Sequence, residues 1–143
     1  MNTITRFAVV LYVIGAISGL LSVALAAFAA HALINIAPTG EQAVVWFKEA
    51  TAFQMNHALA SIGVTAISER LQVGRGRSLM RVGAAFLAAG AILFPGALYS
   101  VSFGGPVFFA PYGGVAAMIG WALFAVAAVV TYVQRQPASE QDF

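Results

Sequence analysis

Long apolar runs separated by short polar stretches dominate the order of residues along the chain. A helix of about 20 apolar residues crosses a hydrocarbon core of about 30 Å, so runs of this length are candidates for membrane spans. Four runs qualify by length, and they cover residues 7–33, 50–68, 82–103 and 113–133. The pattern predicts an all-α membrane protein, a four-transmembrane-helix bundle that forms one domain over residues 1–133.

Local sequence features refine the ends of these runs. Thr39 and Gln42 have the spacing of a capping box, which predicts a helix start and a short interfacial helix around Trp46 that leads into the second span. Pro95 removes a backbone donor within the third span and predicts a kink there. Residues 134–143 are polar, so we expect a disordered cytoplasmic tail.

Small residues four positions apart mark faces where helices can approach closely. Gly15 and Gly19 form such a pair in the first span, and Ala116 and Gly120 form another in the fourth. Lipid provides no hydrophobic drive for helix association, so close contact between backbones matters more than in water. The spacing favours packing within one bundle over a dedicated dimer motif.

The composition requires a lipid environment. Hydrophobic residues make up 61% of the chain and charged residues 8%, whereas soluble domains carry about 25% charged residues. The net charge of +2 does not indicate nucleic acid binding, because the cations gather between apolar runs. The absence of cysteine excludes disulfide exchange, thiolate catalysis and cysteine-ligated metal centres.

The distribution of Lys and Arg predicts which way the chain points. The second connection holds Arg70, Arg75, Arg77 and Arg81, and together with the two ends this side carries six cations against Lys48 alone on the other. The positive-inside rule then predicts a multi-pass protein of the bacterial inner membrane with both termini in the cytoplasm. The same basic loop could contact anionic lipid headgroups or an acidic partner.

Polar side chains of the second span share one helical face. Their spacings are three or four residues, which places them in a stripe that must face protein or water. The stripe consists of Thr51, Gln54, His57, Ser61, Thr65 and Ser68.

Two intramembrane histidines are the sharpest candidates for chemistry. We expect His31 and His57 to lie at similar depth, in a candidate polar cluster with Gln54 and Ser61. The imidazoles could be hydrogen-bonding struts, ligands of a metal or haem, or part of a route for protons or a ligand. No cofactor is predicted, and the metal or haem at His31 and His57 stays an alternative.

Several motifs together resemble a known family. The carrying segments are Ala26 to Leu33, Gln54 to Ala60, Phe94 to Tyr99, and Pro111 to Gly114 followed by Gly120-Trp121. In this order they resemble the YgdD/YwdK-type family of small four-helix bacterial membrane proteins of unknown function. The resemblance covers nearly the whole chain and implies fold and location, but it supplies no catalytic residues.

These observations give three hypotheses for function. The predicted spans contain no Asp, Glu, Lys or Arg, which disfavours a coupled transporter and a hydrolase, so an enzyme is not favoured. The preferred hypothesis is a non-enzymatic accessory or scaffold subunit that contacts the lipid bilayer and packs in a larger membrane complex or with itself. The second is a bundle that binds a small molecule, metal or haem through His31 and His57, and the third is a small channel or transporter.

Overall fold

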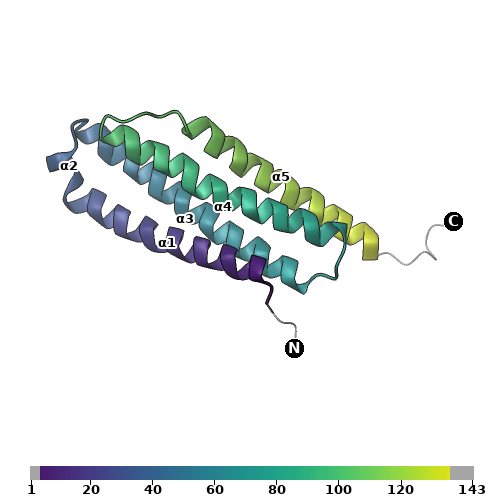
Figure 1. Cartoon of the computed structure of the whole chain (residues 1–143). Helices are drawn as coiled ribbons and strands as arrows, with labels where there is room; N and C mark the ends of the chain where they lie inside the picture. Colours follow the sequence, from purple (N-terminus) through teal and green to yellow (C-terminus); the bar gives the residue numbers. More distant parts are fainter. Residues whose placement is uncertain (1–3, 136–143) are drawn as a thin grey trace.

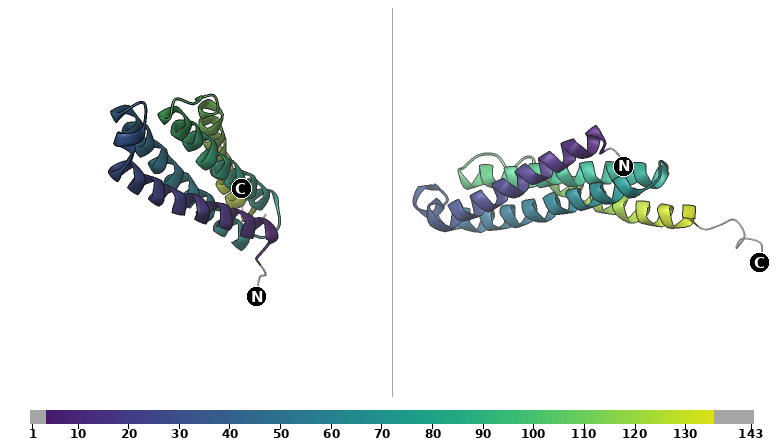
Figure 2. Two further views of the ribbon diagram at one scale, coloured as in Figure 1. Left: turned by 60° about the vertical axis from the view of Figure 1, so that its left-hand side comes forward. Right: turned by 90° about the horizontal axis from the view of Figure 1, so that it is seen from below.

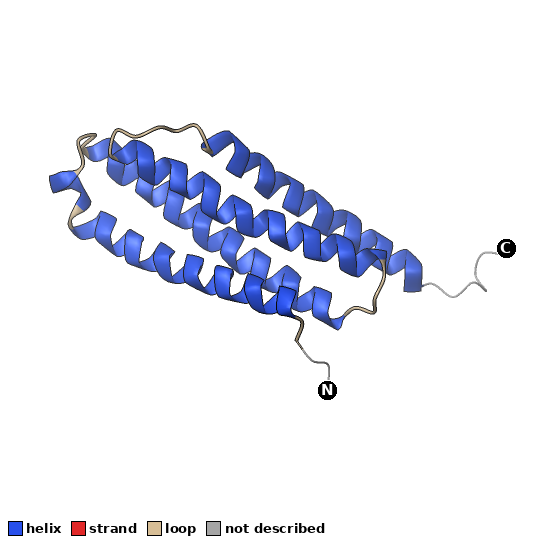
Figure 3. Cartoon of the chain, in the orientation of Figure 1, coloured by secondary structure: helices blue, strands red, loops and turns tan. Residues whose placement is uncertain are grey.

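Every regular element of the structure is a helix. The structure is a computed structural model, and it describes residues 4–135. These residues form five helices, and the predicted all-α class is therefore confirmed (Figures 1 and 3). The helices are α1 (Arg6–His31), α2 (Leu33–Ile36), α3 (Glu41–Arg70), α4 (Arg75–Ser102) and α5 (Ala110–Arg135).

The number of membrane spans differs from the prediction. Among the described residues, three helices are long and apolar enough to cross a membrane, namely α1, α4 and α5. The prediction of a four-transmembrane-helix bundle is therefore wrong. The physical reason lies in α3, which is the longest helix at 30 residues but begins with a charged stretch and carries the polar stripe. Both features lower its hydropathy, so length alone was a poor guide.

The helices form an open row rather than a closed bundle. The main contacts join α1 to α3, α3 to α4, and α4 to α5, and a smaller contact joins α1 to α4. Figure 2 shows the pair α1 and α3 opening away from the pair α4 and α5. Consequently α1 and α5 are the two edges of the row, and α3 and α4 are its interior members.

Glycines bring α4 and α5 into backbone contact. A Cβ added at Gly120 would lie 2.7 Å from Leu87 Cγ, 2.9 Å from the Leu87 nitrogen and 3.0 Å from the Gly83 carbonyl oxygen. Real Cβ atoms do not approach backbone atoms this closely, so the interface accepts only hydrogen at this position. Because dispersion contacts are dense at such a crossing, this pair is the tightest part of the row.

The helix start predicted near Thr39 and Gln42 is confirmed, because α3 begins at Glu41, but several local details differ from the prediction. The Thr39 hydroxyl donates to the Ser102 carbonyl at 2.7 Å, and α3 begins after Gly40 without a side-chain cap, so the capping box is not formed. The stretch around Trp46 is the first part of α3, so the interfacial stretch and the second predicted span form one continuous helix. The helix α4 runs through Pro95 without a break, so the kink there stays a prediction, and α4 begins at Arg75, within the stretch expected to be a loop. Apart from Gln134 and Arg135 at the end of α5, the predicted tail lies outside the described residues.

Candidate functional site

The polar stripe of α3 is turned toward the neighbouring helices. All of its members except the half-buried His57 are buried. Ser61 donates to the Ala84 carbonyl of α4 at 2.9 Å, and Ser22 of α1 donates to the Thr51 carbonyl at 2.9 Å. Thr51 and Thr65 donate to carbonyls one turn earlier in α3. These hydroxyls are therefore bound to backbone oxygens, as is common where helices pack in a membrane.

His57 uses both ring nitrogens within the protein. Its Nδ1 lies 2.9 Å from the Phe53 carbonyl, and its Nε2 lies 3.3 Å from the indole nitrogen of Trp121 on α5. The indole can only donate, so Nε2 accepts and Nδ1 carries the proton. The ring also stacks on Phe53 with centroids 3.9 Å apart. This arrangement fits a strut between α3 and α5 and leaves no free nitrogen for a metal.

The structure does not bring the two histidines together. His31 is the last residue of α1 and is exposed, at the edge of the row, whereas His57 faces Trp121 on α5. Within residues 4–135 no group of three or more potential metal ligands occurs. The expected cluster is therefore divided: Gln54, His57 and Ser61 lie on α3, and His31 lies apart from them.

Gln54 takes part in a different polar contact. The Tyr99 hydroxyl of α4 donates to Gln54 Oε1 at 2.7 Å. Gln54 is 5% exposed, and Ser18 of α1, which is 4% exposed, lies beside it along the gap between α1 and α4. Sequence reasoning found Gln54 through the stripe but missed Tyr99 and Ser18, because neither residue stands out in its own segment.

The small-residue faces are occupied inside the chain. Gly15 lies against Ile62 and the Ala58 carbonyl of α3, and Gly120 lies against α4. Gly19 has the Met55 sulfur of α3 as its nearest neighbour, 3.8 Å from where a Cβ would stand, and Ala116 is buried. These faces are therefore not available to a partner protein.

A different face of α3 is uncovered. It carries Ala52, Asn56, Leu59 and Gly63, which follow one another at spacings of three or four residues and are all exposed. A Cβ at Gly63 would meet nothing within 4 Å. Within the part of the chain that the structure describes, the Asn56 side chain makes no hydrogen bond. The face therefore combines small residues with one polar amide that no helix of this chain covers.

Asn56 lies at mid-height of the row. The neighbouring contacts on α3 reach Ser22 and Gly15 on α1, which flank the middle of that helix. On the other side, Phe53 packs on Phe94 of α4 with centroids 4.4 Å apart, and Ser61 reaches Ala84. Asn56 therefore stands level with the middle of α1 and α4, which are two of the candidate spans.

A charged cluster ties the start of α1 to α3 and α4. Glu69 Oε1 accepts from Arg81 at 2.7 Å and from Arg77 at 3.4 Å, and its Oε2 accepts from the Thr5 backbone nitrogen at 3.1 Å. The hydrogen bond from Arg81, with those from Thr5 and Arg77, outweighs partial burial and lowers the pKa of Glu69 from 4.5 to about 2. The carboxylate therefore stays ionised and holds three segments together.

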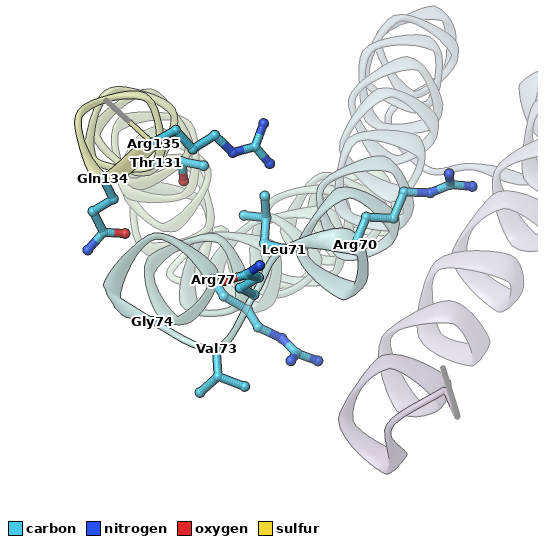
Figure 4. A pocket seen from close by; sticks show the side chains of 9 residues that line it. Arg70, Leu71, Val73, Gly74, Arg77, Thr131, Gln134 and Arg135 are labelled. Atoms are coloured by element: carbon cyan, nitrogen blue, oxygen red, sulfur yellow. The ribbon is translucent and has the colours of Figure 1, made fainter. Parts of the chain in front are cut away.

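Three arginines, one of which is Arg77 of the charged cluster, line a cavity at the same end of the row. It measures about 640 Å³, lies between residues 70–74 and the end of α5, and is lined by Arg70, Arg77 and Arg135. In Figure 4 the guanidinium groups of Arg70 and Arg135 end well apart from each other. Val73, in the connection between α3 and α4, is 90% exposed. The guanidinium groups are therefore spread over a surface and do not converge on a site for a single anion.

The fold and this distribution of residues define an all-helical integral membrane protein, embedded through apolar helices and basic at one end. Residues 25–114 match a family described as a protein of unknown function, DUF423. The chain belongs to this family.

Several curated relatives support the assignment. The chain is 35% identical over 121 residues to the UPF0382 inner membrane protein YgdD of Escherichia coli K12, covering 82% of this chain and 87% of the relative. It is 34% identical over 125 residues to the UPF0382 membrane protein YwdK of Bacillus subtilis, covering 84% and 96%. A UPF0382 membrane protein of Haemophilus influenzae is 34% identical over 109 residues, covering 74% and 82%. No solved structure matches the chain. The resemblance to the YgdD/YwdK-type family is thus confirmed, and the protein is an inner membrane protein of a family whose function is unknown.

Proposed function

We propose that the protein is a non-enzymatic scaffold subunit of the inner membrane, and that it associates through the uncovered face of α3, first with a second copy of itself. The observation that carries the proposal is the exposed amide of Asn56 at mid-height of the row. A polar side chain facing hydrocarbon without a partner costs free energy, whereas one that meets another helix stabilises the contact.

A second copy suits this face because an amide is self-complementary. Asn56 offers two donors on its nitrogen and an acceptor on its oxygen, so a two-fold axis near it lets each copy donate to the other. Ala52 and Gly63 on the same face are small enough to let the backbones approach. The scaffold hypothesis therefore keeps its support, but with this face in place of the glycine faces of α1 and α5.

Cysteine crosslinking in native membranes tests the association. The chain has no natural cysteine, so Leu59→Cys provides a single thiol on the proposed face, and Val129→Cys, exposed on α5, is the control position. We expect oxidation to produce a disulfide-linked dimer of the Leu59→Cys protein and little of it for Val129→Cys.

The amide itself is tested by a second substitution. Adding Asn56→Leu to the Leu59→Cys protein should weaken dimer formation about tenfold, as expected for the loss of two reciprocal interhelical hydrogen bonds of about 0.6 kcal/mol each. Asn35→Leu, the same change at an exposed asparagine in α2, should leave it unchanged. Equal crosslinking in both double variants, or a dominant adduct with another protein, would contradict self-association through Asn56.

Orientation forms part of the same proposal. We infer that the arginine-rich end faces the cytoplasm, which would place both termini there. Two observations support this. Thr5 contacts Glu69, and residues 70–74 line one cavity with Arg135. Both ends of the described chain therefore lie beside the basic residues. Cations near the membrane surface favour the anionic cytoplasmic leaflet.

A membrane-impermeant maleimide checks the orientation. The reagent is added to spheroplasts, which keep the inner membrane intact. A cysteine introduced by Val73→Cys should react with it only after the inner membrane is permeabilised. Val107→Cys, in the connection at the other end of α4, should react in both conditions. The reverse pattern would place the arginine-rich end outside the cytoplasm.

A further inference from the structure

The gap between α1 and α4 contains a groove, and we propose that it binds a lipophilic molecule through a carbonyl oxygen. The groove has a volume of about 360 Å³, at the small end of the range of about 300–1,000 Å³ for ligand sites. This site goes beyond the association through α3, since it uses other residues and another face.

The shape of the groove follows from the open row. Helices α1 and α4 make only a small contact with each other, and α3 lies behind them as the floor. Ile17 of α1 and Ile92 of α4 are exposed at the mouth, which therefore opens sideways between two candidate spans. Gly96 is also on the lining. A Cβ added there would meet nothing within 4 Å, so the groove has open space beside this residue.

The floor of this apolar groove holds polar groups that lack protein partners. Gln54 Oε1 accepts from the Tyr99 hydroxyl, and this leaves the Gln54 amide nitrogen as a donor with no acceptor among residues 4–135. The Ser18 hydroxyl is likewise unpaired there, although other buried hydroxyls of α1 and α3, such as those of Ser22 and Ser61, reach carbonyls. Both side chains are more than nine-tenths buried and line the groove.

The unpaired groups define the chemistry of the ligand. Two donors facing one apolar space, with no cation or carboxylate on the lining, suit an uncharged acceptor such as a carbonyl oxygen. Donors that face an apolar space without an acceptor cost free energy, so an occupant that accepts from them is favoured over a plain hydrocarbon chain. Molecules of this chemistry within a bilayer include ester-linked lipids and quinones with apolar tails, and the mouth admits either from the side.

Protection of a single cysteine detects the occupant. Ile92→Cys places a thiol at the mouth in a chain without other thiols, and Val129→Cys is the control on α5. The purified protein in a maltoside detergent, which has no carbonyl, is reacted with a small maleimide at increasing concentrations of a short-tailed benzoquinone or a short-chain diacylglycerol. The benzoquinone is fully substituted on its ring, so that the thiol cannot add to it. We expect one of these probes to slow the reaction of the Ile92→Cys protein with a saturable dependence and not to slow that of the Val129→Cys protein.

Three further changes separate the groove from nonspecific partition. Gly96→Leu fills the groove and should abolish protection, whereas Gly114→Leu on α5, where a Cβ also meets nothing within 4 Å, should preserve it. Ser18→Ala breaks no hydrogen bond among the described residues and should weaken binding about tenfold. Protection by the quinone alone would identify the ligand as a quinone, and protection by the diacylglycerol alone would identify it as an ester-linked lipid. Absence of protection by both, or equal protection after Gly96→Leu, would overturn the site and leave the test of Asn56 unaffected.

Discussion

Replacing Gly120 with leucine is expected to destabilise the protein by about 3 kcal/mol or more, because the new side chain has no space between α5 and α4. The Cβ alone would lie 2.9 Å from the Leu87 nitrogen and 3.0 Å from the Gly83 oxygen. Backbone atoms of a helix cannot turn aside as a flexible side chain can, so the two helices must separate. The midpoint of thermal unfolding in detergent measures the loss.

Gly114→Ala is the matched control for this prediction. It lies on the same helix, but its Cβ would meet nothing within 4 Å. Alanine has a higher helix propensity than glycine by about 1 kcal/mol, so this variant should be as stable as the parent or slightly more stable. If the two variants unfolded at the same temperature, α4 and α5 would not pack as closely as described.

Replacing Glu69 with glutamine is expected to cost about 2 kcal/mol, the second largest effect. The change removes the carboxylate that Arg77 and Arg81 share, and it leaves both guanidinium groups partly buried, with side chains 17% and 27% exposed. The link from α3 to the start of α1 through the Thr5 nitrogen is weakened in the same step. Glu49→Gln, at an exposed acid of the same helix, should change the unfolding temperature little.

The acid dependence of stability provides a second readout for Glu69. Its pKa in the folded protein is about 2, below the usual 4.5, so the folded state holds the proton less tightly than the unfolded state does. The stabilisation is therefore complete above about pH 4.5 and is lost as the pH falls toward 2. Unfolding midpoints measured from pH 6 to pH 3 should decline less steeply in Glu69→Gln than in the parent. Identical slopes would contradict the role of this carboxylate.

The sequence predicted the membrane class and the positions of the helices because apolar runs carry that information directly. It wrongly predicted a membrane span in α3, because the length of the run was taken as sufficient. The polar stripe lowers the hydropathy of this helix although the helix is long. The capping box failed for a tertiary reason: the Thr39 hydroxyl binds the Ser102 carbonyl, 63 positions away along the chain. Contacts of this kind cannot be read from local spacing.

The candidate site was predictable only in part. Helical periodicity placed Gln54, His57 and Ser61 on one helix, but it gave no information on which neighbour each would meet. Trp121, the partner of His57, and Tyr99, the partner of Gln54, stand 64 and 45 positions away along the chain. The similar depth expected for His31 and His57 was wrong, because Ala58, next to His57, lies against Gly15 in the middle of α1, whereas His31 is the last residue of that helix.

The order of the helices in the row also bears on how the chain assembles. Each large interface joins two long helices that follow one another in the sequence, with only the short α2 between the first two. Such an arrangement has low contact order, which is associated with fast folding. Every helix can dock on the one made just before it while synthesis continues, so no early segment must wait exposed for a partner from the far end of the chain.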